Sequence, residues 1–99
     1  MEKNNVQDKK LIAIGEALID FIPDSAGGAI KDVNAFLPAV GGAPANVCGA
    51  FTGLGGKSEM ITQLGMDGFG DKILEVFENA KIGSSYVKRT DTANTSLAF

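Results

Sequence analysis

The sequence predicts an α/β fold built from parallel strand–helix–strand units. The apolar run Leu11–Ile14 stops at Gly15, which is the pattern of a strand buried on both faces. Further along, two stretches with apolar residues at helical spacing alternate with stretches typical of strands. Strands that alternate with helices indicate a parallel sheet, because each crossover has to return the chain to the same edge.

Composition narrows the class of protein. The chain has 99 residues, enough for one small domain or part of a larger one, and its 44% hydrophobic content argues against disorder. The net charge of −3 and the scattered basic residues argue against a nucleic-acid partner. With no histidine and Cys48 as the single cysteine, we expect no disulfide framework, no metal site and a reducing cytoplasmic location.

Leu11–Ile22 is the one candidate membrane or signal segment. Glu16 and Asp20 interrupt it, and it is too short to cross a bilayer. We therefore expect no membrane partner.

The first forty residues predict a terminus, one long extended segment and a small β insertion. Residues 1–10 are polar and predict a flexible terminus. The extended pattern continues through Glu16–Ile22, and turn residues follow at Pro23–Ser25 and Gly27–Gly28. The mixed stretch Ala29–Val40 predicts one or two short strands.

A first helix is expected to begin near Pro44, because proline suits the first helical turn, and to stop at Gly55–Gly56. The strand Lys57–Leu64 follows it. Apolar residues at helical spacing predict the buried face of this helix, namely Val47, Ala50, Phe51 and Leu54.

The turn Gly65–Gly68 predicts a second helix, with Asp67 as its N-cap. We expect that helix to be closed by Gly83. Short strands are expected at Tyr86–Arg89 and Ser96–Phe99, joined by a polar turn. Apolar residues at helical spacing predict the buried face of the second helix, namely Phe69, Ile73, Val76, Phe77 and Ala80.

Two nucleotide-binding motifs are incomplete. Lys57-Ser58 resembles the end of a phosphate-binding P-loop, but Phe51 stands where that loop needs its first glycine, and the order here is helix then strand. A dinucleotide fingerprint fails as well, because Ser58 stands in place of its third glycine. A dinucleotide-binding oxidoreductase is therefore only a distant alternative.

The block Gly41–Asn46 is a better candidate for a ligand site. Gly41 and Gly42 allow the backbone to approach a ligand, and Asn46 in the first turn of the helix offers both a donor and an acceptor. Asp20 adds a carboxylate that can accept hydrogen bonds from sugar hydroxyls. The same residues also fit a tight turn and a solvated strand end, and chemistry alone does not separate the two interpretations.

Three segments together resemble the ribokinase-like sugar kinases, also called the PfkB family. They are Ala13–Asp20, Val40–Val47 and Gly65–Gly70, in the family's order and at suitable spacing. The Gly-Glu-x-x-x-Asp and Gly-Gly-Ala-Pro-Ala-Asn elements look most like the fructokinases, and the resemblance covers nearly all of residues 11–99. It implies a ribokinase-like α/β fold, with the N-terminal part of a Rossmann-like parallel sheet and a small β lid.

The resemblance also assigns roles. Asp20 and Asn46 would bind sugar hydroxyls, Gly41-Gly42 would lie against the sugar, and Phe99 would face it from the lid. The lid itself would be formed by residues of about 22–40 and 84–99. We interpret Asp67 as a structural turn cap and not as a catalytic acid.

The departures from the family concern the chemistry. Such kinases use ATP and Mg²⁺ and are about three times as long, and their second signature, Asp-Thr-x-Gly-Ala-Gly-Asp, does not occur here. That signature carries the catalytic base and the anion hole, so we expect no catalytic residue in this chain and no activity from it alone.

The expected parent function is phosphorylation of fructose to fructose 6-phosphate. The alternatives are a nucleoside or ketodeoxygluconate kinase of the same fold and a non-catalytic sugar-binding or interaction module. The lid strands and the end of the chain at Phe99 would expose sheet edges, so we expect a homodimer through the lid or association with the missing C-terminal part.

Overall fold

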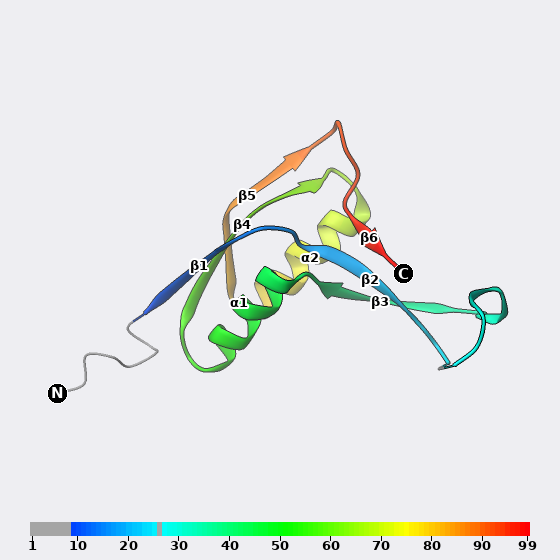
Figure 1. Cartoon of the computed structure of the whole chain (residues 1–99). Coiled ribbons are helices and arrows are strands. Elements are labelled where there is room, and N and C mark those ends of the chain that lie inside the picture. The colour runs from blue at the N-terminus through cyan, green and yellow to red at the C-terminus, as the bar shows by residue number, and fades with distance from the viewer. Residues whose placement is uncertain (1–8, 26) are drawn as a thin grey trace.

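The computed structural model describes residues 9–25 and 27–99 (Figure 1). Most of the expected flexible terminus, at residues 1–8, lies outside the described residues. Lys10, the last residue of the predicted terminus, is instead the first residue of a strand.

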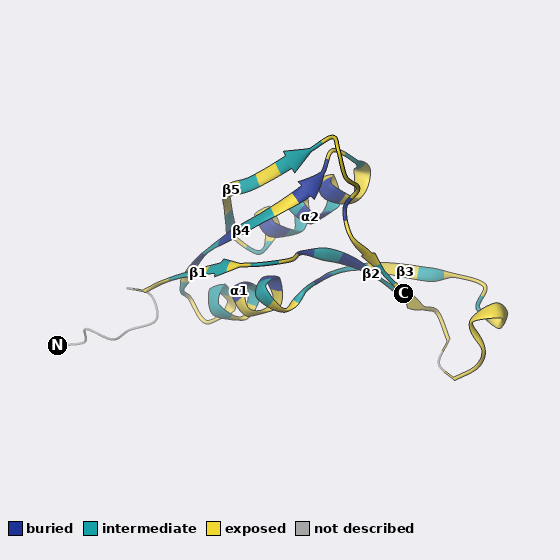
Figure 2. Ribbon diagram, turned by 45° about the horizontal axis from the view of Figure 1, so that its top comes forward, coloured by how far each residue is buried: buried dark blue, intermediate teal, exposed yellow. Residues whose placement is uncertain are grey.

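Within the described residues, six strands form two separate three-stranded sheets (Figure 1). Sheet A is parallel and has the order β1 (Lys10–Ile14), β4 (Lys57–Gly65) and β5 (Ile82–Thr90). The connections run through α1 (Ala43–Gly53) and α2 (Gly68–Asn79), so the predicted parallel strand–helix–strand units are confirmed. Both helices lie on the same side of sheet A (Figures 1 and 2), as two crossovers of one hand require.

The core lies between those helices and sheet A. Its largest fully buried side chains include Met60 and Leu64 from β4 and Ile73 and Phe77 from α2. The opposite face of sheet A is open among the described residues. Ile14 on that face is 75% exposed, so the prediction that the first strand is buried on both faces is wrong for this chain. Helices cover one face only, and the pleat turns alternate β1 residues outward.

Sheet B is built around β2 (Leu18–Pro23), which follows β1 after a short break at residues 15–17. It pairs antiparallel with β3 (Phe36–Gly41) and parallel with β6 (Leu97–Ala98). A loop containing a short 3-10 helix, Ile30–Asp32, joins β2 to β3 and extends away from sheet A (Figure 1). The expected small β insertion is therefore a hairpin.

The expected lid ranges differ from the observed sheets at their boundaries. β2 begins sheet B at Leu18, four positions before the expected range of 22–40. The first part of the expected range 84–99 belongs to β5 and pairs with β4 in sheet A, and only Leu97–Ala98 pairs in sheet B. The strand at Tyr86–Arg89 is part of a longer one, since β5 begins at Ile82.

The buried face of α1 differs from the expected one. Ala45 and Cys48 are buried, whereas Val47 is 53% and Leu54 71% exposed. Small residues face the sheet because α1 packs closely on β4: the Ser58 hydroxyl donates to the Cys48 carbonyl oxygen at 3.5 Å.

In α2 the predicted core positions Ile73 and Phe77 are buried, but Phe69 is 38% exposed. The helix ends before Gly83, which lies in β5; the left-handed residue after the helix is Lys81, with φ 61°. No helix among the described residues is both long enough and apolar enough to cross a membrane.

Candidate functional site

Asp20 lies near the middle of β2, at the junction between the two sheets. It pairs with Ala39 on β3 and with Ala98 on β6, and it is half-buried. Because β2 follows the carboxyl end of β1, Asp20 lies beyond the edge of a parallel sheet at which α/β proteins bind their ligands. None of the ion pairs within the described residues involves Asp20, so its carboxylate has no cationic partner there.

Gly41 is in direct contact with the Asp20 carboxylate. A Cβ built on Gly41 would overlap Asp20 Oδ2 and would lie 3.1 Å from Asp20 Cγ. The backbone of Gly41 does not have a positive φ, so this contact, not conformation, is what excludes a side chain. Gly41 therefore leaves room for the Asp20 carboxylate. The sequence had suggested another reason for this glycine, namely the close approach of a ligand to the backbone.

Gly42 is the N-cap of α1 and has φ 103°, a conformation that favours glycine. A Cβ there would lie 2.5 Å from the Glu16 carbonyl oxygen. The pair Gly41-Gly42 is thus required by contacts with residues 16–20, and these contacts bring the start of α1 beside β2.

Asn46 lies in the first turn of α1, and its side chain is exposed. Its backbone N–H donates to the Gly42 carbonyl oxygen at 3.0 Å and begins the helix. Pro44, at the predicted first turn, packs against Gly15 at the end of β1. Among the described residues no side chain caps α1, so its N-terminal N–H groups are available on the side of Gly41 and Gly42.

Phe99 is placed differently from the other predicted site residues. Its ring stacks on Phe21, with centroids 5.1 Å apart, and meets Phe36 edge-on at 5.5 Å. Side chains alternate along a strand, so Phe21 and the Phe99 ring that stacks on it lie on the face of sheet B opposite to Asp20. The structure brings Asp20, Gly41 and Gly42 together, but it does not bring Phe99 to the carboxylate.

Asp67 caps α2, as predicted. Its carboxylate accepts from the Gly70 N–H at 2.8 Å and from the Thr95 N–H at 2.9 Å. The Thr95 hydroxyl donates to it at 2.7 Å. The bonds from the Thr95 backbone, the Thr95 hydroxyl and Gly70, with the nearby Arg89 charge, lower the pKa of Asp67 below its ordinary value of 3.8. A carboxylate held in this way is a structural acceptor and not a proton donor.

Sequence reasoning did not identify Thr95 and Arg89 as partners of Asp67. Thr95 is buried, with 4% exposure, although it lies in a polar stretch that reads as a turn. It is 28 positions from Asp67 in the sequence, and no local sequence pattern predicts so distant a contact.

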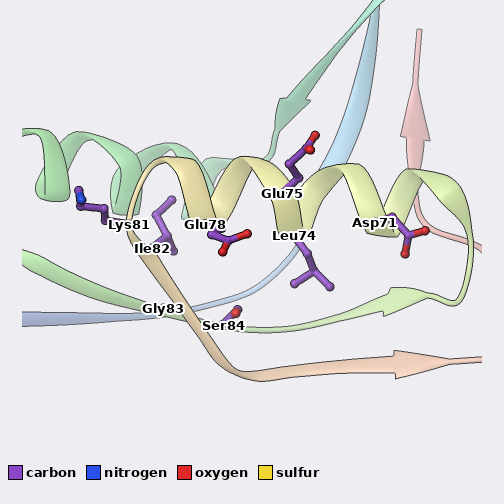
Figure 3. A pocket seen from close by; sticks show the side chains of 8 residues that line it. All are labelled: Asp71, Leu74, Glu75, Glu78, Lys81, Ile82, Gly83 and Ser84. Carbon is purple, nitrogen blue, oxygen red and sulfur yellow. The ribbon is translucent and has the colours of Figure 1, made fainter.

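A groove of about 780 Å³ lies elsewhere, between α2 and β5 (Figure 3). Leu74 and Glu78 face β5 there, and Glu75 points away from it (Figure 3). None of the predicted site residues lines this groove, and Asp71 at its end is paired with Arg89 at 2.9 Å. We do not assign it a ligand.

Within the described residues, no group of three or more His, Cys, Asp or Glu side chains could hold a metal ion. The candidate site therefore offers a carboxylate, a pair of glycines and a helix N-terminus. Together these can bind and orient a hydroxyl-rich ligand.

A parallel sheet with an antiparallel lid-like hairpin and a carboxylate at their junction defines the N-terminal part of a ribokinase-like fold. Comparison with known proteins agrees: residues 8–99 match the family described as pfkB family carbohydrate kinase. The chain belongs to this family.

Three relatives show how close the match is. "Probable fructokinase-5" from Arabidopsis thaliana is 43% identical over 90% of this chain and 28% of its own length. Among solved structures, the fructokinase from Xylella fastidiosa has 39% identity and a TM-score of 0.79, with 89% of this chain and 27% of that chain covered. An uncharacterized sugar kinase from Pyrococcus horikoshii has 34% identity and a TM-score of 0.85, covering 90% and 29%. The chain therefore spans less than a third of the length of these relatives.

Proposed function

We propose that this chain forms the sugar-binding part of an ATP-dependent carbohydrate kinase, the parent kinase, which phosphorylates fructose to fructose 6-phosphate. The observation that carries the proposal is the Asp20 carboxylate held against Gly41 beside the open N-terminus of α1. The likeness to fructokinases over nearly all of the chain supports fructose as the substrate.

In this proposal, Asp20 accepts hydrogen bonds from two sugar hydroxyls, and Asn46 contacts a further hydroxyl. A carboxylate can accept several hydrogen bonds and suits a polyol better than a single neutral acceptor does. Gly41 and Gly42 keep the wall of the site free of side chains. Phe99 contributes indirectly, by packing against Phe21 on the other face of the lid.

The nucleotide and the metal are assigned to the rest of the parent kinase. The Xylella fastidiosa fructokinase has been solved with ATP bound, which supports ATP as the phosphoryl donor. We assign no Mg²⁺ or triphosphate site to this chain: within the described residues no group of three or more His, Cys, Asp or Glu side chains could hold a metal ion, and the sequence has no Gly-Ala-Gly-Asp segment. We derive no catalytic step from this chain and propose that it is inactive alone.

The open face of sheet A supports association with the remaining part of the kinase. Ile14, Ile61 and Tyr86 line a shallow groove of about 630 Å³ on this face. The buried Glu59 Oε1 has no hydrogen-bond partner among the described residues, although Lys10 lies 3.6 Å from the other carboxylate oxygen. A buried acceptor without a partner is costly, so we propose that the covering segment supplies a donor.

A homodimer through sheet B is the alternative association.

A cytoplasmic location is supported by Cys48, which is free and buried.

The test compares the 99-residue chain with the parent kinase in a coupled ADP-release assay with Mg-ATP. Fructose, ribose, ketodeoxygluconate and a nucleoside form the substrate panel. We expect fructose turnover by the parent and none by the chain alone. Turnover by the chain would refute the assignment of catalysis to the missing part, and a parent that binds sugar without turnover would be a binding module.

Asp20→Asn in the parent tests the site itself. Loss of charge from an acceptor that bonds two hydroxyls should raise KM for fructose by about tenfold or more. Asp24→Asn is the matched control, because Asp24 lies in the exposed turn of the same hairpin. An unchanged KM in Asp20→Asn would show that Asp20 is not a substrate contact.

A further inference from the structure

A second feature of the fold joins the two sheets next to the candidate site. It consists of Asp67, Thr95 and Arg89, which we call the clamp. Asp67 lies at the N-terminus of α2, Arg89 lies on β5, and Thr95 lies in the segment that crosses from sheet A to sheet B. The proposed function does not use these residues.

We propose that the clamp is a positioning device that fixes β6 beside β2 and thereby fixes Asp20, so that it controls the affinity of the parent kinase for its sugar. This inference rests on the proposed function for the identity of the ligand, but not for the mechanical role of the clamp.

Thr95 is held through both its backbone N–H and its side-chain hydroxyl. Its N–H donates to Asp67 Oδ2 at 2.9 Å, and its hydroxyl donates to Asp67 Oδ1 at 2.7 Å. The same hydroxyl accepts from the Gly65 N–H at 3.0 Å. Since Thr95 is buried and its hydroxyl is bonded on both sides, the crossing segment has one preferred position at this residue.

Arg89 holds Asp67 from the other side. Its Nε donates to the Gly65 carbonyl oxygen at 2.9 Å, and its Nη2 donates to the Asp67 carbonyl oxygen at 3.2 Å. Nη2 also donates to the Asp71 carboxylate at 2.9 Å. The guanidinium thus attaches the turn that contains Asp67 to the ends of β4 and β5.

Gly65 and Gly70 are explained by the clamp. A Cβ on Gly65 would lie 2.5 Å from Asp67 Oδ2 and 2.6 Å from the Thr95 nitrogen. A Cβ on Gly70 would lie 2.9 Å from Arg89 Nη2 and 3.1 Å from Thr95 Oγ1. The Gly-x-Asp-x-x-Gly turn therefore has the composition that close approach of the crossing segment requires.

The path from the clamp to Asp20 is short. The residue after Thr95 is Ser96, whose carbonyl oxygen accepts from the Ile19 N–H at 3.1 Å. The next two residues are β6, in which Ala98 pairs with Asp20. A two-residue strand has too few ladder bonds to hold itself in place, so its register depends on the anchor that precedes it.

The consequence for binding follows from the geometry of Asp20. Asp20 lies on a strand between two others: Gly41 of β3 contacts its carboxylate, and Ala98 of β6 pairs with its backbone. If β6 separates from β2, Asp20 loses one of its two neighbouring strands, and the carboxylate is no longer held in the position that binds the sugar.

The first experiment measures amide hydrogen exchange of the 99-residue chain by NMR. Thr95→Val keeps the shape of the side chain and removes its hydroxyl, Thr95→Ser restores the hydroxyl, and Thr92→Val makes the same change nearby. The Thr92 hydroxyl contacts that of Thr90 and is exposed, so it is a matched control. The reporters are the amide of Ile19, which bonds to Ser96, and that of Gly15, which follows β1 and bonds to Ile61 of β4.

We expect Thr95→Val to exchange the Ile19 amide about tenfold faster, the factor for loss of one hydrogen bond to a charged group, with Gly15 unchanged. Thr95→Ser and Thr92→Val should behave as the wild type does. Protection of Ile19 that survives in Thr95→Val would overturn the clamp as the device that holds β6. Loss of protection at both amides would show a general loss of stability and would also overturn it.

The second experiment uses the same variants in the parent kinase. Thr95→Val should raise KM for the sugar about tenfold while kcat changes little, because the variant alters how Asp20 is held and not the transferring groups. Thr95→Ser should restore KM. A fall in kcat as large as the rise in KM would refute control of affinity by the clamp. An unchanged KM would refute it as well. If the wild-type parent phosphorylates no sugar, the proposed function fails, whereas the exchange measurement still decides the role of the clamp.

Discussion

Replacement of Gly41 by alanine should separate the binding role of this position from its structural role. The new methyl group would overlap Asp20 Oδ2 and approach Leu18 Cδ1 to 3.5 Å. An extra methyl in a packed site costs about 1–3 kcal/mol, and here the overlapping atom is the free end of a side chain, so the cost should lie near the lower limit. The carboxylate relieves the overlap by rotating away from its position.

That rotation should cost more in binding than in stability. In the proposed site, each hydrogen bond between a sugar hydroxyl and the Asp20 carboxylate would contribute about 1.5–3 kcal/mol, so loss of one should lower affinity at least about tenfold. Isothermal titration of the parent kinase with fructose gives the affinity, and urea unfolding of the 99-residue chain gives the free energy of unfolding.

Gly49→Ala is the matched control. Gly49 lies in α1, and a Cβ there meets no heavy atom within 4 Å. This variant should bind fructose as the wild type does and should stabilise the chain by up to about 1 kcal/mol through helix propensity. A Gly41→Ala protein that is folded and binds fructose as tightly as the wild type would refute the assignment of Asp20 to the sugar. A double variant with Asp20→Asn should bind no more weakly than Asp20→Asn alone.

Three further predictions concern stability. The pKa of Asp67 is lowered in the folded chain. Its contribution to the free energy of unfolding is therefore fully present above the ordinary pKa of 3.8, and it is lost as the pH falls through the lower pKa of the folded state. Asp67→Asn should therefore destabilise the chain at pH 7 and remove part of the acid dependence of the urea midpoint below pH 3.8; an acid limb identical to that of the wild type would contradict this. Phe77→Ala, at a side chain with 1% exposure, should cost about 3–5 kcal/mol or prevent folding. Val47→Ala, at an exposed position of α1, should change the free energy of unfolding by less than about 0.5 kcal/mol, and a large loss there would favour the apolar face expected from helical spacing.

Several structural features could be predicted because their signals are local. Asp67 precedes its helix by one residue and accepts from the N–H three positions on, which is the spacing of an N-cap. The order of strands and helices in sheet A follows from the hydrophobic period of each segment and from the short connections between them. The family resemblance also rests on short segments whose residues are visible without the fold.

The buried face of α1 illustrates what local spacing does not specify. Val47 and Leu54 form an apolar stripe in sequence, yet Ala45 and Cys48 face the sheet. Apolar spacing gives the period of a helix, but the close approach of α1 to β4 selects small side chains at the contact. The same limit applies to Phe99, whose side of sheet B depends on the pairing of Ala98 with Asp20.

The sequence by itself determined the class of fold, the positions of the turns and the group of residues near Asp20 and Gly41. These depend on backbone preferences and hydrophobic periods that act over a few residues. The tertiary structure decided that Gly41 leaves room for a carboxylate, that Phe99 lies on the opposite face, and that Asp67 holds Thr95 from 28 positions away. Such contacts depend on how whole strands and helices pack. Residues separated by a long stretch of chain can meet in many ways, and only the packed fold selects one of them.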